Sequence, residues 1–166
     1  MAQWGMSKEQ VIKLEGEAGQ QEKSQGLEGI GYKRRISNLD CNIYYVFAEN
    51  KLTRGIYMFV EKHSNKNLYI DDYNEIKKAL TDKYGKPKDD NIFWRNDLFK
   101  DDHSEWGLAI SIGHLRYFTT WEPPETEITL GLHGDNYEIS LHVEYAGIKF
   151  KELEEKVKKK AEKGVW

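Results

Sequence analysis

The sequence predicts an α+β protein in which helices lie on one side of an antiparallel sheet or sheets. Three segments show helical periodicity with capping signals, and the segments between them alternate apolar and polar residues as strands do. Helices and strands are segregated along the chain, which is typical of this class. The expected order of elements is α-βββ-α-ββββ(β)-α, with the bracketed strand optional.

One domain is expected over residues 1–147. Two helix-then-strand units of similar length suggest a tandem αβ repeat within it, with halves at 4–70 and 71–147. A C-terminal helix at 148–166 should pack on this domain. The chain has 166 residues, which is long enough to form a core without crosslinks, and its single cysteine excludes an intramolecular disulfide.

The first helix is predicted close to the N-terminus. Ser7 is placed as the N-cap, Gln10 completes a capping box, and Gly16 is placed to end the helix. The segment 16–31, rich in glycine and glutamine, is expected to be a mobile loop. Three strands should follow at 32–37, 41–48 and 53–61, the last two forming a hairpin with Asn50 and Lys51 at its tip.

The second helix has the clearest pattern. Asp72 is expected to cap it, with Glu75 completing the box, and Gly85 and Pro87 should end it. Its inward residues recur at helical spacing: Tyr73, Ile76, Leu80 and Tyr84.

The last part of the chain predicts two hairpins and a helix. After a strand at 92–96 and an acidic loop, a strand at 106–112 should turn at Gly113-His114. This register places Trp106 opposite Trp121 and Ile110 opposite Tyr117. After Pro123 and Pro124, a second hairpin should turn at Asp135-Asn136. The final helix should then bury Phe150, Leu153, Val157 and Ala161.

Two sequence elements carry a family resemblance. "WGMSKEQV" with "LEG", and "YNEIKKALTDKYGKP" with Trp94 and "YEISLHVEY", resemble an uncharacterised family of small bacterial proteins. The helix-then-hairpin unit is distantly similar to outer-membrane assembly lipoproteins and to tandem-repeat β-lactamase inhibitor proteins. The chain departs from the lipoproteins because no cysteine lies near its start. The resemblance implies a fold and a bacterial origin, but no catalytic residues.

Charge and hydropathy exclude several classes of partner. Charged residues make up 32% of the chain but the net charge is only −3, which argues against a nucleic-acid surface. No apolar run approaches the length of a membrane span, so no membrane insertion is expected. The N-terminus lacks the pattern of a signal peptide. A cytoplasmic location is expected for the chain as it stands, or export if a signal peptide was removed.

No catalytic, cofactor-binding or metal-binding set emerges from the sequence. The acidic loop 97–105 holds four carboxylates and a histidine, but its spacing matches no known calcium loop. His133 and His142 should lie on the polar face of the last hairpin without facing each other, as ordinary surface residues. Cys41 alternates with Ile43 and should be buried and inert.

The middle hairpin gives the nearest indication of function. With the tip at Asn50-Lys51, both faces are apolar, and the second face would carry Tyr44, Tyr57 and Phe59. The C-terminal helix should cover this face; otherwise these three residues form a surface for a protein partner or a homodimer. The sequence favours a non-catalytic binding or scaffold module. The alternative is a hydrolase with a site assembled around loop 97–105.

Overall fold

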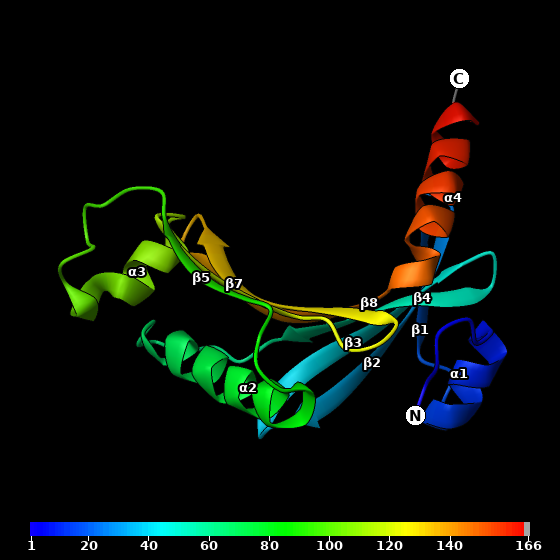
Figure 1. Cartoon of the computed structure of the whole chain (residues 1–166), viewed down its shortest axis with the longest axis horizontal. Helices are drawn as coiled ribbons and strands as arrows, with labels where there is room; N and C mark the ends of the chain where they lie inside the picture. The colour runs from blue at the N-terminus through cyan, green and yellow to red at the C-terminus, as the bar shows by residue number, and fades with distance from the viewer. Residues whose placement is uncertain (165–166) are drawn as a thin grey trace.

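The protein is built on one eight-stranded antiparallel sheet (Figure 1). The computed structural model describes residues 1–164. The strand order across the sheet is β1-β2-β3-β4-β8-β7-β6-β5, which confirms the predicted α+β class. The strands are β1 (Gln20–Ser24), β2 (Leu27–Ile36), β3 (Leu39–Ala48), β4 (Lys51–Phe59), β5 (Asp89–Trp94), β6 (Leu115–Trp121), β7 (Thr126–Asp135) and β8 (Glu138–Gly147). The α-helices are α1 (Lys8–Glu15), α2 (Leu68–Tyr84), α3 (Trp106–Ser111) and α4 (Lys151–Lys163).

The sheet consists of two four-stranded meanders that meet at one junction. β1–β4 follow α1, and β5–β8 follow α2, so each meander is preceded by a helix. The meanders join where β4 pairs with β8, for example through Tyr57 and Val143. The first meander ends at Phe59 and α2 begins at Leu68, so the structural halves meet between these residues.

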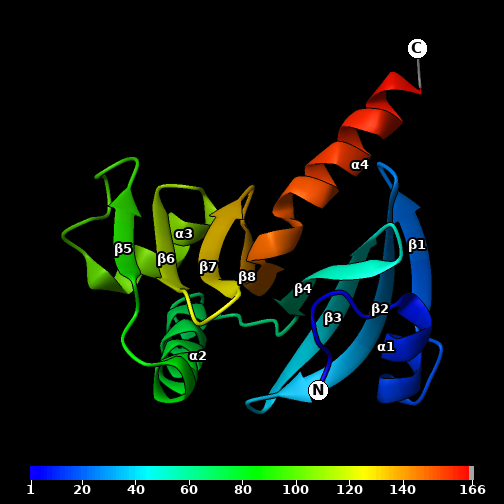
Figure 2. The same cartoon turned by 45° about the vertical axis from the view of Figure 1, so that its right-hand side comes forward.

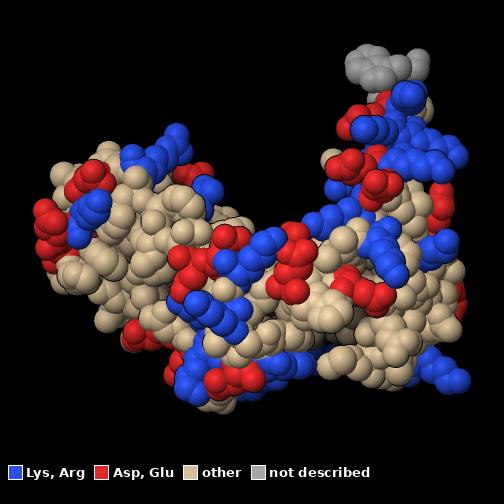
Figure 3. Space-filling model, in the orientation of Figure 1, with Lys and Arg blue, Asp and Glu red and all other residues tan. Residues whose placement is uncertain are grey.

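The helices divide between the two faces of the sheet (Figures 1 and 2). We call the face against which α1, α2 and α3 pack the inner face. Its core has one cluster under α2 and α3 that includes Trp121 and Leu130, and another under α1 that includes Ile30 and Phe47. Helix α4 rises from the opposite, outer face, which the space-filling view shows as a charged hollow beside α4 (Figure 3).

Helix α1 forms as predicted. Ser7 Oγ accepts from Gln10 N (3.2 Å), and the Gln10 side chain accepts from Ser7 N (2.8 Å), which completes the capping box. Gly16 ends the helix with φ of 79°, in the left-handed region. None of the helices in residues 1–164 is both long and apolar enough to span a membrane.

Helix α2 buries three of its four predicted inward residues, while Tyr84 is only half-buried, and the helix begins earlier than predicted. Tyr73, Ile76 and Leu80 are buried. The helix starts at Leu68, so Asp72 lies inside it and accepts from His63 Nε2 at 2.6 Å instead of capping. The actual N-cap, Asn67, makes no cap bond, because its side chain binds the backbone around α3.

Two segments were assigned wrongly. The expected loop 16–31 contains β1 and the start of β2; β1 is an exposed edge strand, so no apolar alternation marks it. The expected strand 106–112 contains helix α3 instead, and Trp106 does not face Trp121. Gly107 lets α3 pack closely against a neighbouring backbone, because an added Cβ would lie 2.4 Å from the carbonyl carbon of Lys66.

The register of the β3–β4 hairpin differs from the prediction and reverses one face. The turn residues are Glu49 and Asn50, both with positive φ. This shift of the tip moves each pair by two and keeps the faces. A bulge that leaves Thr53 unpaired moves the pairs back by one, so beyond it the net shift is one residue, which turns side chains to the other face.

The register of the last hairpin also differs from the prediction, but the predicted faces are kept. Its turn residues are Asn136 and Tyr137, one position later than predicted, so the pairs shift by two and Ile128 still faces the core.

Helix α4 does not cover the middle of the β3–β4 hairpin. Its buried Glu154 binds Thr53, and its Val157 lies against the β1–β2 turn at Gly26.

Candidate binding groove

A groove of about 850 Å³ crosses the inner face between α1 and α2. Its floor is the junction of β4 and β8, and its walls are the C-terminal ends of the two helices. The volume lies within the range of small-molecule and cofactor sites. We call it the tyrosine groove, because four tyrosines line it together with Trp4 and Leu14: Tyr45, Tyr57, Tyr84 and Tyr145.

The tyrosines come from four different elements, and three of them form a connected aromatic surface. Tyr57 on β4 and Tyr145 on β8 have ring centroids 5.3 Å apart, and Tyr84 at the end of α2 lies 6.5 Å from Tyr145. Burial raises the pKa of Tyr57 and of Tyr145 above the ordinary value, so both phenols stay protonated at neutral pH. They can donate hydrogen bonds to a ligand while their rings supply apolar contact.

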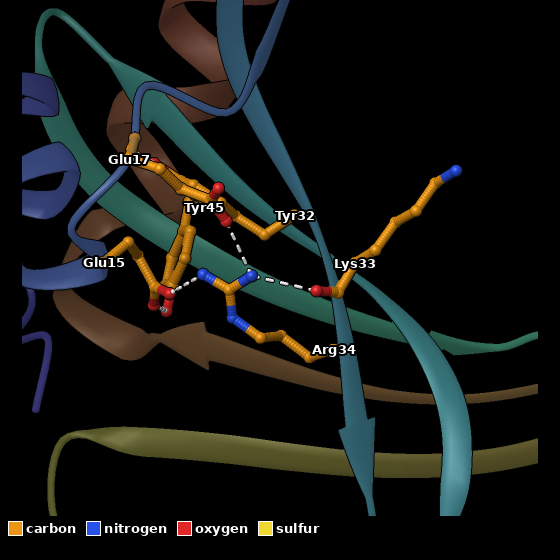
Figure 4. Close-up of polar contacts among 6 residues, drawn as sticks. All are labelled: Glu15, Glu17, Tyr32, Lys33, Arg34 and Tyr45. Carbon is orange, nitrogen blue, oxygen red and sulfur yellow. Dashed lines mark hydrogen bonds and ion pairs between the residues drawn. The ribbon is translucent and has the colours of Figure 1, made fainter.

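One wall of the groove carries an ordered polar network (Figure 4). Glu15, the last residue of α1, accepts from Tyr45 Oη at 2.5 Å and from Arg34 Nη2 at 2.7 Å. Arg34 Nη1 also donates to Glu17 (2.8 Å) and to the Lys33 carbonyl (2.9 Å). The guanidinium therefore bridges two carboxylates and fixes the end of α1 against β2 and β3.

The opposite wall is formed by the end of α2 and the β6–β7 connection. Lys83 Nζ lies 5.3 Å from the centroid of the Tyr84 ring, and Pro123 and Pro124 continue the apolar surface. Trp4 Nε1 donates to Thr126 Oγ1 at 2.8 Å, which ties the N-terminal segment to β7. Both walls are thus held by contacts between residues distant in sequence.

The two carboxylates of the groove are already bound by other side chains. No serine, cysteine or histidine is among the described residues that line it. Its Glu15 is bound by Tyr45 and Arg34, and its Glu125 pairs with Lys149 at 3.1 Å. Acid–base catalysis and nucleophilic catalysis need a free group next to a partner.

The three residues predicted to form an interaction surface are separated by the sheet. Tyr57 lies in the tyrosine groove, and Phe59 packs against the core under α2. Tyr44 pairs with Ile56 on the outer face, half-buried. The bulge at Thr53 is the cause, because the predicted register placed all three side chains on one face.

The acidic loop serves local structure. Asp102 caps a short 3-10 helix by accepting from Ser104 N at 3.1 Å, and His103 stacks on Trp106. Asn67 holds this turn through the carbonyls of His103 and Ser104. Within residues 1–164 there is no group of three or more His, Cys, Asp or Glu that could hold a metal ion.

The remaining candidates lie away from the groove opening. Cys41 is 2% exposed, and burial raises the pKa of its thiol to about 11. His142 pairs with Gly131 and not with Thr129 as the predicted register had it, so its ring lies 5.6 Å from that of His133. The two histidines do not pair with each other, as predicted, but their rings are neighbours at diagonal positions.

The sequence predicts only part of the groove. Tyr57 belongs to the predicted interaction surface and Tyr84 to the inward side of the second helix, but no motif marks Tyr45, Tyr145 or Trp4 as part of a site. These side chains come together in one groove only when β4 pairs with β8.

Comparison of the chain with protein-family models, with curated proteins and with solved structures finds no match.

Proposed function

We propose that the protein is a non-catalytic binding module of bacterial origin and that the tyrosine groove is its binding site. The observation that supports this most directly is the groove itself: about 850 Å³, with aromatic walls and a limited set of charged side chains, Glu15, Lys83 and Glu125. Sites of this size and composition are the usual places where proteins hold small ligands or peptide segments. The bacterial origin rests on the sequence resemblance alone.

The rigidity of the walls supports binding rather than simple packing. Glu15, Tyr45 and Arg34 fix one wall, and Trp4 with Thr126 fixes the other. A groove that is already formed spares a ligand part of the ordering cost of association. The exposed Leu14, at 52% of its surface, adds an apolar contact at the rim.

The proposal is tested by ligand screening on the labelled protein. A mixed set of small aromatic, aliphatic and charged fragments and short peptides is added to ¹⁵N-labelled protein, and amide shifts are recorded. Saturable shifts should concentrate at residues of the tyrosine groove, and mass spectrometry should recover every ligand unchanged. Chemical conversion of a ligand, or binding confined to loop 97–105, would overturn the proposal in favour of an enzyme.

A further inference from the structure

A glycine in the floor of the tyrosine groove has no structural reason to be a glycine. Gly55 lies inside β4, where its backbone is buried and pairs with Tyr45 on β3 and Tyr145 on β8. A glycine inside a strand weakens it, because the unfolded chain is more flexible and no side chain packs. Such a glycine usually marks a special backbone angle, a close neighbour or a bound ligand.

The first two explanations do not apply to Gly55. Its φ is not in the left-handed region, so a side chain would cause no backbone strain. A Cβ built at this position meets no atom within 4 Å. Gly131, in β7, shows the contrast, because a Cβ there would lie 2.6 Å from the His142 ring. Space over Gly131 is filled by a protein side chain, and space over Gly55 is empty.

The empty space has aromatic residues on both sides. Tyr45 and Tyr145 occupy the two cross-strand positions flanking Gly55, and Tyr57 follows it on the same face. Neighbouring strands lie about 4.8 Å apart, so the two flanking backbones are about 10 Å apart. A flat ring in contact with a surface on each side needs about 7 to 8 Å. We call the space over Gly55, between Tyr45 and Tyr145, the Gly55 slot.

Building on the proposed function, we infer that the Gly55 slot receives a flat aromatic ring carried by an extended peptide. The ring rests on the β4 backbone between the two tyrosines, where offset or edge contacts between aromatic rings are favourable. The groove of about 850 Å³ extends beyond the slot on both sides, to Leu14 at the end of α1 and to Lys83 and Tyr84 at the end of α2. This continuation accommodates the chain on either side of the ring.

The test uses the full-length ¹⁵N-labelled protein and four defined probes. They are p-cresol, which is the tyrosine side chain alone, 4-methylcyclohexanol, which has a similar size but is not flat, a capped Gly-Tyr-Gly peptide and a capped Gly-Leu-Gly peptide. We expect p-cresol to shift the amides of Gly55, Tyr45 and Tyr145 saturably and about ten-fold more tightly than 4-methylcyclohexanol. Gly-Tyr-Gly should bind more tightly than p-cresol, and Gly-Leu-Gly more weakly than Gly-Tyr-Gly.

Two substitutions test the position of the ring. Gly55→Val fills the slot with a residue that strands favour, so it should weaken the binding of p-cresol and Gly-Tyr-Gly about ten-fold or more without lowering Tm. If the valine variant does not fold, the Gly55→Ala variant, which adds only a Cβ to empty space, is used instead. Gly29→Val is the matched control, because Gly29 pairs with Val46 on the outer face and its Cβ would meet atoms only at 3.5 Å or more.

The outcomes separate this inference from the proposed function. Equal binding of p-cresol and 4-methylcyclohexanol, or p-cresol binding that survives at Gly55→Val, would overturn the slot and leave the groove as a binding site. Equal affinity for p-cresol and Gly-Tyr-Gly would overturn the peptide as the source of the ring. The absence of saturable shifts from all four probes would overturn the inference, while the fragment screen decides the groove independently.

Discussion

The phenol of Tyr45 on β3 donates a hydrogen bond of 2.5 Å to Glu15, the last residue of α1. Arg34 on β2 binds the other oxygen of the same carboxylate at 2.7 Å. The Glu15 side chain is only 20% exposed, so both contacts are largely shielded from water. The end of α1 is therefore attached to the sheet at the wall of the tyrosine groove.

Removing the Tyr45 hydroxyl should loosen this attachment. We expect Tyr45→Phe to lower the free energy of unfolding by about 1–2 kcal/mol, because a half-buried carboxylate loses one of its two donors. Chemical denaturation followed by circular dichroism measures the change. Tyr44→Phe is the control, since Tyr44 lies on the outer face, away from Glu15. Equal stability of the two variants would mean that the contact adds nothing.

The attachment of α4 depends on Glu154. Its carboxylate accepts from Thr53 Oγ1 at 2.5 Å and from Arg54 Nε at 3.0 Å, and the residue is buried. Glu154→Ala would leave the hydroxyl and the guanidinium short of a partner, so we expect a loss of about 2–3 kcal/mol. Glu155→Ala, at the next, exposed position, should change stability by less than about 0.5 kcal/mol. Amide exchange along α4 would report the same difference locally.

Cys41 should react slowly in the native state. It is 2% exposed, and burial raises its thiol pKa to about 11 from a model-peptide value of 9.0. Because the folded-state pKa is the higher one, the native thiol stays protonated while the unfolded thiol ionises, so this contribution to stability is lost as pH rises from 9 toward 11. A thiol reagent at pH 8 should label native protein much more slowly than urea-unfolded protein. Comparable rates would place the thiol at the surface.

The outer-face histidines should make stability sensitive to acid. Burial, followed by the nearby charge of His133, lowers the pKa of His142 below its usual 6.5. The unfolded chain therefore takes up this proton first, and stability falls as pH drops below 6.5. His142→Gln should reduce the loss of stability between about pH 6.5 and 5. Denaturation midpoints across this range measure it, and an unchanged slope would exclude His142 as the cause.

The sequence predicted the elements that have strong local signals. Ser7, Gln10 and Gly16 determine α1 within a few residues, and the spacing of Tyr73, Ile76 and Leu80 determines the buried side of α2. β1 was missed because an exposed edge strand needs no apolar alternation. α3 was taken for a strand because a short buried helix and a strand have similar apolar content.

The candidate site was harder to predict than the elements. The bulge at Thr53 changes the face of every residue after it in β4, and no local sequence signal marks it. The groove also depends on the pairing of β4 with β8, residues that are far apart in the chain, such as Gly55 and Tyr145. Each tyrosine alone is compatible with an ordinary core, so their convergence could not be inferred from spacing.

The junction of β4 with β8 has a consequence for folding. Every other strand pairing joins consecutive strands through short hairpins or the α3 segment, whereas Gly55 and Tyr145 must close a loop of most of the chain. Closing a long loop is slow, so each meander should form first and the junction last. The Gly55 slot takes Tyr45 from the first meander and Tyr145 from the second. A ligand there binds only molecules that have completed the last folding step, and it would slow their unfolding by holding the two meanders together.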